Sequence, residues 1–391
     1  MSTIKPNFNT NNVKNEPLIT EALVPTLGEI WLFIDSQTFG GIETHVLELA
    51  QGLISESAQY SDSVRVVLLT KFAPEAIIVE KLNTLKIPYC YLSDLVSYSA
   101  ESTGNKASQL KRAVMYYQPK LIHAHGYKAS LISKLVKLSP RLSTTKQITT
   151  YHAGETPTGR VWVYDFLDRY TSWISNHSLV VSSKISRKLA TRSTLLNNFV
   201  SVADVSQPSV SSDMQTAQSS HFNHLHHYRF GFVGRLSHEK AADRFVTLAK
   251  DFEQHLFNLF GDGPERSQLA QSSPANCQFH GHQNDMAAVW PKIDVLIITS
   301  RYEGLPMAAL EAMVRGIPVI ATAVGNLPQL IDHGSNGYIA HSESELNTNL
   351  NAWLALSPTD KEIMSAKARQ RVINDYSPQA VIPQLLNCYR L

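Results

Sequence analysis

Two carboxylates, Glu303 and Glu311, lie eight residues apart at an expected turn between a strand and a helix. Residues 293–298 are an apolar run typical of a buried parallel strand, and residues 307–314 have a helical pattern with Pro306 at its expected first residue. The start of such a helix carries unpaired N–H groups and a partial positive charge, which suit a phosphate. A carboxylate on each side of the helix start can bind sugar hydroxyls, so the stretch predicts a site for a sugar joined to phosphate.

Two cations follow another expected strand, at residues 229–233. Arg235 and Lys240 bracket the turn that leads into the next helical pattern, so their charges can be held close together. Arg offers a planar fork of donors and Lys a point charge, and together they can bind a diphosphate. A further strand-to-helix turn is expected after residues 256–260, beginning at Gly261.

A glycine pair stands between a strand expected at residues 29–35 and a helical pattern that runs to Leu53. Gly40 and Gly41 have no Cβ atom, so the backbone can approach a ligand closely, and Glu43 follows them. A strand, a glycine turn and a helix start can form an approach loop for a phosphate or a sugar. A tight turn without a ligand is the alternative.

Histidines end two further strands of the first half. His123 and His125 close the strand expected at residues 121–125, and His152 follows the strand expected at residues 147–151. We expect His123 and His125 to face in opposite directions, the first into the core and the second into a cleft. His152 can meet a second substrate or cap a turn. No cysteine or further histidine stands at the sequence spacing of a zinc partner, so we expect no metal site.

Strands alternate with helices along most of the chain, which predicts an α/β fold with two doubly wound, parallel-sheet domains. We place the first domain at residues 28–200 and the second at residues 229–376, followed by a final helix at residues 377–391. Residues 1–27 are expected to form a disordered tail, and residues 201–228 a linker with a mobile insertion. Ligands of such sheets bind outside the carboxyl ends of the strands.

Composition narrows the class of protein and its surroundings. The chain has 391 residues, of which 43% are hydrophobic and 17% are charged, the composition of an ordinary globular protein. It contains no apolar run close to the ~20 residues that a membrane-spanning helix needs. Its three cysteines are widely separated, and an odd number argues against a disulfide framework, so we expect a cytoplasmic setting. The net charge of +2 and the absence of interleaved aromatics disfavour a nucleic-acid partner.

Positive charge is concentrated in the first half of the chain. Residues 102–154 hold nine Lys and Arg and no Asp or Glu. This favours an anionic neighbour, either the acidic inner face of the cytoplasmic membrane or a phosphorylated acceptor. A solvated basic surface that is neutralised from elsewhere in the fold is an equal alternative.

These motifs together resemble the glycosyltransferases of family 4, which have the GT-B fold. The stretch from Ser300 to Thr322 carries S-x-x-E-G-L-P and then E-A-M-x-x-G-x-P-V-I-A-T, and residues 234–240 carry G-R-L-x-x-x-K. The glycine loop at residues 39–43 is similar to the first loop of that family. The similarity extends over nearly the whole chain beyond residue 28. The sequence departs from the family pattern at three positions, where Ala241 and Asn326 replace Gly and Gln329 replaces Glu.

The resemblance implies transfer of a sugar from a nucleoside diphosphate sugar, with retention of anomeric configuration and without a metal ion or other cofactor. No Asp-x-Asp occurs in the sequence, which agrees with an enzyme that needs no metal ion. The resemblance implies a cell-surface polysaccharide, a lipopolysaccharide or a lipid-linked glycan as the acceptor. It also assigns roles to residues. The expected catalytic residues are His125, Glu303, Arg235 and Lys240; donor contacts are expected from Gly40, Gly41, Arg235, Lys240, Gly261, His282, Glu303, Gly304, Leu305 and Glu311, and acceptor-side contacts from Glu43 and His152.

Two other functions are compatible with the same motifs. A nucleotide-sugar 2-epimerase of GT-B fold would isomerise the donor and need no acceptor, and an acceptor-dependent product would exclude it. A non-catalytic relative that binds sugar nucleotides is the second alternative, left open by Asn326 and Gln329. The basic first domain and the loop at residues 39–43 argue for a transferase over an epimerase. Against the non-catalytic alternative stands the joint presence of Arg235, Lys240, Glu303 and Glu311.

Overall fold

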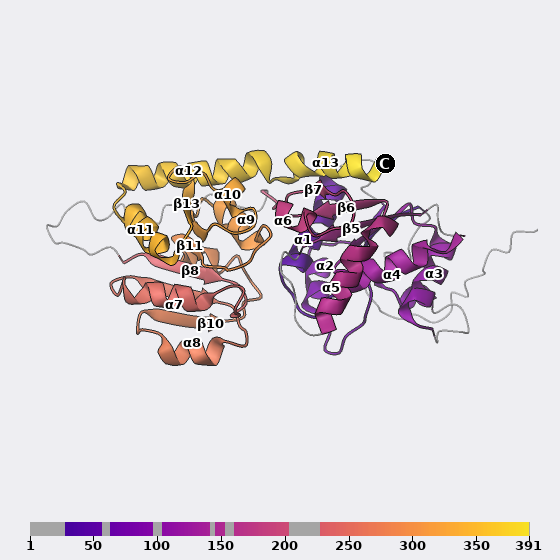
Figure 1. Ribbon diagram of the computed structural model, residues 1–391, viewed down its shortest axis with the longest axis horizontal. Helices are drawn as coiled ribbons and strands as arrows, with labels where there is room; N and C mark the ends of the chain where they lie inside the picture. The colour runs from indigo at the N-terminus through magenta and orange to yellow at the C-terminus, as the bar shows by residue number, and fades with distance from the viewer. Residues whose placement is uncertain are drawn as a thin grey trace, which may run out of the picture.

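A computed structural model describes residues 28–56, 63–96, 104–140, 145–152, 160–202 and 227–390. The tail expected at residues 1–27 and most of the linker expected at residues 201–228 lie outside the described residues. The described segments form two α/β units, each built on a parallel sheet (Figure 1). The predicted fold of two doubly wound domains is confirmed.

The first unit contains a seven-stranded sheet with the order β3-β2-β1-β4-β5-β6-β7. Its strand β1 (Ile30–Ile34) is buried along its whole length and pairs in parallel with β2 (Val64–Leu68) and β4 (Leu121–His125). A strand in the middle of a parallel sheet is apolar throughout because helices cover both faces. The other strands of this sheet are β3 (Tyr89–Tyr91), β5 (Lys146–Tyr151), β6 (His177–Val180) and β7 (Thr194–Leu195).

Helices connect these strands and cover the sheet. The helices of the first unit are α1 (Gly41–Glu56), α2 (Ile77–Thr84), α3 (Lys106–Tyr117), α4 (Tyr127–Lys137), α5 (Arg160–Tyr170) and α6 (Ser183–Ser186), with 3-10 turns η2 (Asp94–Val96) and η4 (Thr171–Ile174).

The second unit contains a six-stranded parallel sheet with the order β10-β9-β8-β11-β12-β13. Its strands are β8 (Arg229–Val233), β9 (Leu256–Phe260), β10 (Cys277–Gly281), β11 (Val295–Ile298), β12 (Val319–Thr322) and β13 (Gly337–Ala340). Its helices are α7 (Ala242–Lys250), α8 (Arg266–Ser272), α9 (Met307–Val314), α10 (Leu327–Leu330), α11 (Glu343–Leu354) and α12 (Pro358–Asp375), with the 3-10 turn η6 (Trp290–Lys292).

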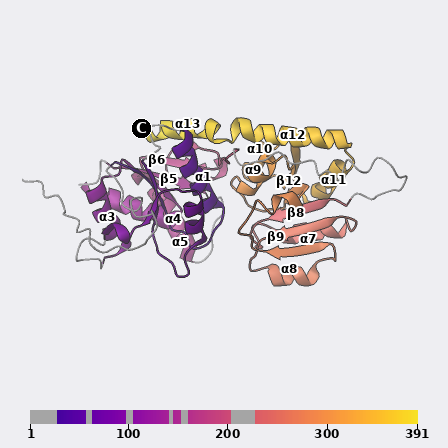
Figure 2. The same cartoon turned by 180° about the vertical axis from the view of Figure 1, so that it is seen from behind.

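The last two helices tie the units together. Helix α12 lies along the second unit and α13 (Pro378–Arg390) continues along the first, an arrangement visible from both sides (Figure 1, Figure 2). Val381, Ile382 and Leu385 of α13 are buried in the core that β1, β2 and α1 form. The hydroxyl of Tyr389 lies 2.8 Å from Nδ1 of His123 on β4.

The winding of each sheet reverses beside a central strand, between β1 and β4 in the first unit and between β8 and β11 in the second. Loops that leave neighbouring strands in opposite directions open a crevice at the carboxyl edge, where doubly wound folds bind ligands. Gly40 and Gly41 follow β1, and His125 ends β4. Arg235 follows β8 and Glu303 follows β11. These five predicted site residues therefore leave the sheets at the two reversal points, whereas Gly261 and His152 follow β9 and β5.

Helix α6 ends at Ser186, and the chain then extends again so that β7 pairs with β6. One local expectation was wrong. Pro306 precedes α9 as its N-cap, with an extended ψ of 130°, and is not its first helical residue. Among the described helices, none is both long enough and apolar enough to cross a membrane.

Candidate functional site

The second unit holds a cation and a carboxylate in direct contact. Nζ of Lys240 and Oγ of Ser300 both lie 2.6 Å from Oε1 of Glu303. Glu303 is buried, whereas the Lys240 side chain is 29% exposed and can still meet a ligand. One carboxylate oxygen thus orients the ammonium group at the carboxyl edge of the sheet.

The loops that carry this pair are held by two hydroxyl hydrogen bonds and a partly buried ion pair. The Thr299 hydroxyl donates to the Ala241 carbonyl at 2.8 Å, and the Thr322 hydroxyl donates to the Ser300 carbonyl at 2.6 Å. The Arg301 guanidinium binds both carboxylate oxygens of Asp243, at 2.9 and 2.6 Å. These contacts fix the loops after β8, β11 and β12 relative to one another, which pre-organises the ammonium group.

Gly261 has a structural reason to be glycine. A Cβ atom there would lie 1.9 Å from the Gly234 carbonyl oxygen, and its φ of +143° disfavours other residues. The Leu236 N–H also donates to the Asp262 carbonyl at 3.0 Å. Gly261 therefore allows the loop that bears Arg235 to pack closely against the end of β9. The Arg235 side chain itself is exposed.

The remaining expected donor contacts on this unit differ in their surroundings. Glu311 lies in the second turn of α9, where burial raises the pKa of its carboxyl group against the opposing effect of Arg315. His282 is exposed after β10. The Leu305 carbonyl accepts a hydrogen bond from Nδ2 of Asn198 at 2.7 Å.

On the first unit, the glycine loop is open to its surroundings. No described atom lies within 4 Å of a Cβ built on Gly41, and a Cβ on Gly40 would meet only Oε2 of Glu43, at 3.6 Å. Neither glycine has a positive φ, so neither packing nor backbone geometry requires glycine here. The space in front of the loop is what a closely approaching ligand would use.

Glu43 supports this loop from the first turn of α1. Its Oε2 accepts a hydrogen bond from the Gly40 N–H at 2.9 Å, and the side chain is buried. Burial raises the pKa of the carboxyl group, while the hydrogen bonds it accepts act in the opposite direction. The geometry therefore gives Glu43 a loop-holding role beside its expected place near the acceptor.

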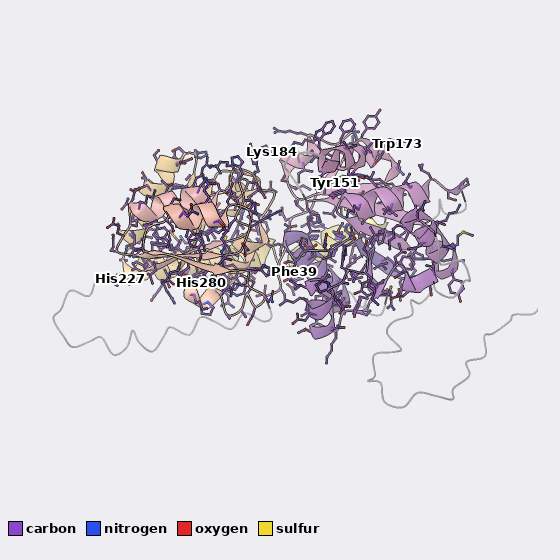
Figure 3. All side chains as sticks on the ribbon, turned by 90° about the horizontal axis from the view of Figure 1, so that it is seen from below. Phe39, Tyr151, Trp173, Lys184, His227 and His280 are labelled. Atoms are coloured by element: carbon purple, nitrogen blue, oxygen red, sulfur yellow. The ribbon has the colours of Figure 1, made fainter. Side chains whose placement is uncertain are left out.

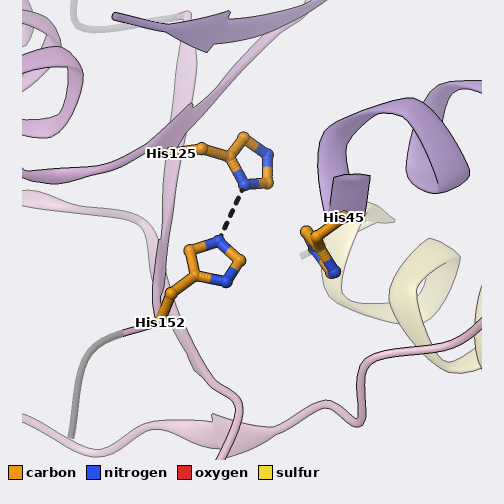
Figure 4. A group of neighbouring side chains, drawn as sticks. All are labelled: His45, His125 and His152. Atoms are coloured by element: carbon orange, nitrogen blue, oxygen red, sulfur yellow. Dashed lines mark hydrogen bonds between the residues drawn. The ribbon is translucent and has the colours of Figure 1, made fainter. Parts of the chain in front are cut away.

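Three histidines from different elements meet at the carboxyl edge of the first sheet (Figure 4). His125 ends β4, His152 follows β5, and His45 comes from the second turn of α1. Nδ1 of His125 lies 3.2 Å from Nε2 of His152, and the rings of His45 and His152 are 4.7 Å apart. We call His45, His125 and His152 the histidine cluster.

Burial keeps the histidine cluster uncharged at neutral pH. Desolvation lowers the pKa of His45 to about 4 and those of His125 and His152 well below their usual value, and the neighbouring rings add to the shifts of the latter two. Among the described residues, both ring nitrogens of His45 and Nε2 of His125 have no hydrogen-bond partner. Buried polar atoms are normally satisfied, so these ring nitrogens remain able to take a hydrogen-bond partner.

The same cluster has the composition of a possible metal site. One ring nitrogen from each histidine lies within 4.8 Å of the others, and neutral imidazole is a ligand that zinc accepts. We based the expectation of no metal site on sequence spacing, which does not detect this cluster, because α1 and β5 bring His45 and His152 to His125 from distant parts of the sequence.

The expectation that His123 and His125 face opposite ways was also wrong. Alternate residues of a strand share a face, and the two rings are 4.2 Å apart. His123 is nonetheless a core residue, because its ring nitrogens lie 2.8 Å from the Tyr389 hydroxyl and 2.7 Å from the Thr150 hydroxyl.

The two halves of the site meet where the units touch. A Cβ on Gly304 would lie 3.0 Å from Val181 and 3.1 Å from the His152 carbonyl oxygen, so glycine permits this close approach. Asn326, buried beside it, donates from Nδ2 to the Val181 carbonyl at 3.0 Å and from its backbone to the Gly304 carbonyl at 2.8 Å. The Glu303–Gly304 turn is thereby placed next to the histidine cluster.

Two residues of this site were missed from the sequence. His45 lies four residues after Gly41, one helical turn into α1, and that spacing could have marked it as a neighbour of the glycine loop. Asn326 was noted only as a departure from a glycine pattern, and no sequence signal indicated that its amide would bridge the two units.

Two family models match consecutive parts of this chain. The model for Glycosyltransferase Family 4 matches residues 39–195, and the model for glycosyl transferases group 1 matches residues 215–371. Together they span most of the chain.

Individual proteins are similar over shorter stretches or at low identity. The N-acetyl-alpha-D-glucosaminyl L-malate synthase of Bacillus anthracis is 29% identical over 42% of this chain and 44% of its own length. The Vi polysaccharide biosynthesis protein of Salmonella typhi is 31% identical over 30% of this chain and 21% of its own length. The chain thus aligns with less than half the length of these curated relatives.

Among solved structures, Anabaena HepE in complex with UDP and glucose superimposes with a TM-score of 0.74 at 16% identity, covering 92% of this chain and 98% of HepE. This likeness extends the GT-B fold over both units. The matched models, the fold and the paired strand-end motifs agree, and the chain belongs to the family 4 glycosyltransferases of the group 1 type.

Proposed function

We propose that this protein transfers a sugar from a nucleoside diphosphate sugar to a glycan acceptor, with retention of anomeric configuration. The observation that carries the proposal is the Lys240–Glu303 pair, held at 2.6 Å beside the helix start of α9 and next to the histidine cluster. This arrangement offers positive charge to a departing diphosphate and hydrogen-bonding groups to a sugar.

In the proposed reaction, an acceptor hydroxyl oxygen forms a bond to the anomeric carbon while the bond from that carbon to the diphosphate oxygen breaks. The electron pair leaves with the nucleoside diphosphate, which also receives the acceptor proton. Lys240 and Arg235 stabilise the growing negative charge, as pre-organised cations do. Oε1 of Glu303 already accepts from Lys240 and Ser300, so we assign its Oε2 to the sugar hydroxyls rather than to nucleophilic attack.

We assign Glu311 to the ribose hydroxyls and the histidine cluster to the sugar beside the reacting carbon. Neutral imidazoles can donate and accept hydrogen bonds but cannot supply a proton at neutral pH, which fits a leaving group that takes the acceptor proton itself. We also propose that no metal ion is needed, because Lys240, Arg235 and the α9 helix start supply the charge that a divalent cation would otherwise bring.

The acceptor that we propose is a growing cell-surface polysaccharide, a lipopolysaccharide or a lipid-linked glycan. The similarity to a Vi polysaccharide biosynthesis protein supports a polysaccharide. The basic residues 102–154 support a second partner, the anionic inner face of the cytoplasmic membrane. The three free cysteines accord with a cytoplasmic setting.

The first test is thermal unfolding of the purified protein with nucleoside diphosphates and their sugars, in the presence of EDTA. UDP and UDP-glucose are tested first because HepE was solved with UDP and glucose. A ligand at about 100 times its Kd should stabilise the folded protein by about 2.7 kcal/mol. Stabilisation by none of the ligands would contradict the proposed donor site, and stabilisation only without EDTA would contradict metal independence.

The second test separates transfer from its alternatives. The stabilising sugar nucleotide is incubated with and without candidate acceptors, and the products are analysed by NMR. A glycoside whose anomeric configuration matches that of the donor is expected only with acceptor. A new sugar nucleotide formed without acceptor would instead identify an epimerase, and donor binding without any product under either condition would identify a non-catalytic binder.

A further inference from the structure

Helix α5 and the following turn η4 have their apolar side facing outward. Trp162 and Phe166 are 47% and 50% exposed, and Tyr170 and Trp173 are both 63% exposed. A surface helix of a globular protein normally buries its apolar face and presents charge to water. The arrangement of α5 is the reverse, so its outer face requires an explanation.

The inward side of α5 is polar and firmly held. Asp168 is buried, and its carboxylate lies 2.6 Å from Nζ of Lys134, which is itself 1% exposed. The same ammonium group donates to the Tyr151 hydroxyl at 2.9 Å, and the Asp168 carboxylate also accepts from the Ser130 hydroxyl. Rotating the helix to bury its aromatic side would break this buried ion pair, which is costly. The outward direction of the apolar residues is therefore fixed by the fold.

The exposed side chains form one continuous stripe. Trp162, Phe166 and Tyr170 follow at intervals of four residues, and their rings stack with centroids 5.6 and 5.9 Å apart. Two aliphatic side chains lie on the same side of the helix, Val163 at 46% and Leu167 at 41% exposure. We call Trp162, Val163, Phe166, Leu167, Tyr170 and Trp173 the α5 face.

Exposed cations lie on the segment after β6, which contacts the η4 end of the α5 face. Lys184, Arg187, Lys188 and Arg192 are exposed on the segment after β6, and the Thr191 hydroxyl of that segment donates to the Ser172 hydroxyl in η4 at 3.0 Å. Figure 3 shows Lys184 and Trp173 on the same edge of the molecule.

The acidic residues of the stretch that contains α5 and these cations are paired with other residues. From Arg160 to Val200 the only acidic residues are two aspartates, Asp165 and Asp168. Asp165 pairs with Arg169 and Asp168 pairs with Lys134. Residues 160–200 therefore carry a net positive charge, with six Lys and Arg against two Asp.

We propose that the α5 face docks onto an anionic lipid bilayer, with its aromatic and aliphatic side chains in the interfacial layer and the adjacent cations on the lipid headgroups. Trp and Tyr favour the membrane interface, and basic residues add attraction to anionic lipids. Val163 and Leu167 favour lipid over a soluble glycan, because aliphatic side chains offer a sugar neither stacking nor hydrogen bonds. The basic surroundings disfavour a second copy of this chain, because two such surfaces would repel each other.

This proposal deepens the proposed function and rests on it for its purpose, since it would bring the cleft to a membrane-bound acceptor. The docking itself needs no donor, no acceptor and no turnover. Docking can therefore be tested independently of sugar transfer, and transfer and docking can each fail while the other holds.

The test is flotation of the purified full chain with phosphatidylcholine vesicles that contain either no or 30% phosphatidylglycerol. Binding is expected to the anionic vesicles and to weaken as salt is added. Of the five tryptophans, Trp31, Trp290 and Trp353 are buried, so a blue shift of tryptophan emission on binding reports on Trp162 and Trp173.

Two sets of variants identify the surface. The triple variant Trp162→Ser, Phe166→Ser, Trp173→Ser is expected to lower the vesicle partition coefficient about tenfold or more, because binding scales with buried apolar area. The matched control Leu256→Ser, Ile363→Ser changes exposed apolar residues of the second unit and should bind as the wild type does. Arg187→Gln, Lys188→Gln, Arg192→Gln should reduce binding to anionic vesicles, whereas Lys250→Gln, Lys292→Gln, Lys367→Gln should not.

Each variant is checked for its melting temperature and for stabilisation by the donor nucleotide, so that loss of folding is not mistaken for loss of docking. Four results would overturn the proposal. These are no binding of the wild type to anionic vesicles, unchanged binding by the aromatic triple variant, a wild-type dimer that the triple variant abolishes without any vesicle binding, and capture of a soluble glycan in place of vesicles. If the donor nucleotide does not raise the melting temperature of the wild-type protein, that result contradicts the proposed donor site and leaves the docking proposal standing.

Discussion

At Glu303, one oxygen receives hydrogen bonds from both Lys240 and Ser300, so the position of the lysine charge depends on a buried carboxylate. The Lys240 ammonium group and the Glu303 carboxylate therefore fix each other's position. The pair is strong because charged hydrogen bonds are short and because part of it is shielded from water. At the scale of single residues, the proposed reaction depends on this pair, on Arg235 and on Glu311.

Lys240→Ala should lower kcat/KM by about 10²–10³-fold, the usual loss when one group that stabilises developing charge is removed. Steady-state kinetics with the donor that stabilises the protein measure this loss. The control is Lys250→Ala, an exposed lysine at the end of α7 in the same unit. Kinetics of Lys240→Ala equal to those of the control would remove Lys240 from the catalytic groups.

Glu311→Gln should weaken donor binding by about tenfold to a hundredfold, because hydrogen bonds to a charged group contribute about 1.5–3 kcal/mol. Isothermal titration of the nucleoside diphosphate measures this effect without turnover. Glu362→Gln on the exposed side of α12 serves as the matched control. If the diphosphate binds Glu311→Gln as tightly as the wild type, Glu311 does not hold the ribose.

At the scale of elements, the histidine cluster exists only because α1, β4 and β5 deliver one residue each to the same edge of the sheet. None of these elements contains the cluster by itself. The strand order β1-β4-β5 and the packing of α1 on the sheet decide how close the rings come. The cluster also links the site to the stability of the first unit, because its imidazoles are buried uncharged.

Stability should fall as the pH drops from about 6.5 toward 4. Desolvation lowers the pKa of His45 to about 4, so between these values the unfolded chain binds the proton and the folded protein does not. The free energy of unfolding therefore rises with pH across this window. Urea unfolding at a series of pH values measures the slope.

His45→Gln removes one titrating group and should reduce that slope by about 1.4 kcal/mol per pH unit. The exposed His341→Gln is the control and should leave the slope as in the wild type. A slope that His45→Gln does not change would contradict the buried, uncharged state assigned to His45.

At the scale of the whole molecule, polar contacts near the site help to fix how the two units sit relative to each other. Nδ2 of Asn326 donates to the Val181 carbonyl at 3.0 Å, and Nδ2 of Asn198 donates to the Leu305 carbonyl at 2.7 Å. Helix α13 adds a larger apolar contact to the first unit. The chain thus combines a permanent connection through α13 with a polar contact near the site that is small enough to open.

Asn326→Ala should open the cleft, because it removes the hydrogen bond that joins the units beside Gly304. We expect a larger radius of gyration in small-angle X-ray scattering and a loss of stability of about 1 kcal/mol. Asn349→Ala is the matched control, since Asn349 is also buried and donates to the Ile339 carbonyl at 3.1 Å within one unit. It should cost similar stability without changing the radius. Equal radii in both variants would show that Asn326 does not hold the units together.

The sequence by itself determined the two doubly wound domains and the strand ends that carry Arg235, Lys240 and Glu303. Alternating apolar periodicity is a local property, and the loops at the carboxyl ends of parallel strands converge by a general rule. The partners Lys240 and Glu303 were therefore foreseeable as neighbours, although 63 residues separate them.

The tertiary structure alone decided the rest. Strand order decides whether His45 meets His125. The Lys134–Asp168 ion pair decides whether α5 turns its aromatic side outward. The docking of the two units decides whether the Asn326 amide reaches Val181. These contacts join residues far apart in the chain, and no local pattern encodes such distances. Periodicity specifies which face of an element is apolar, whereas only the packing of the whole molecule specifies what that face meets.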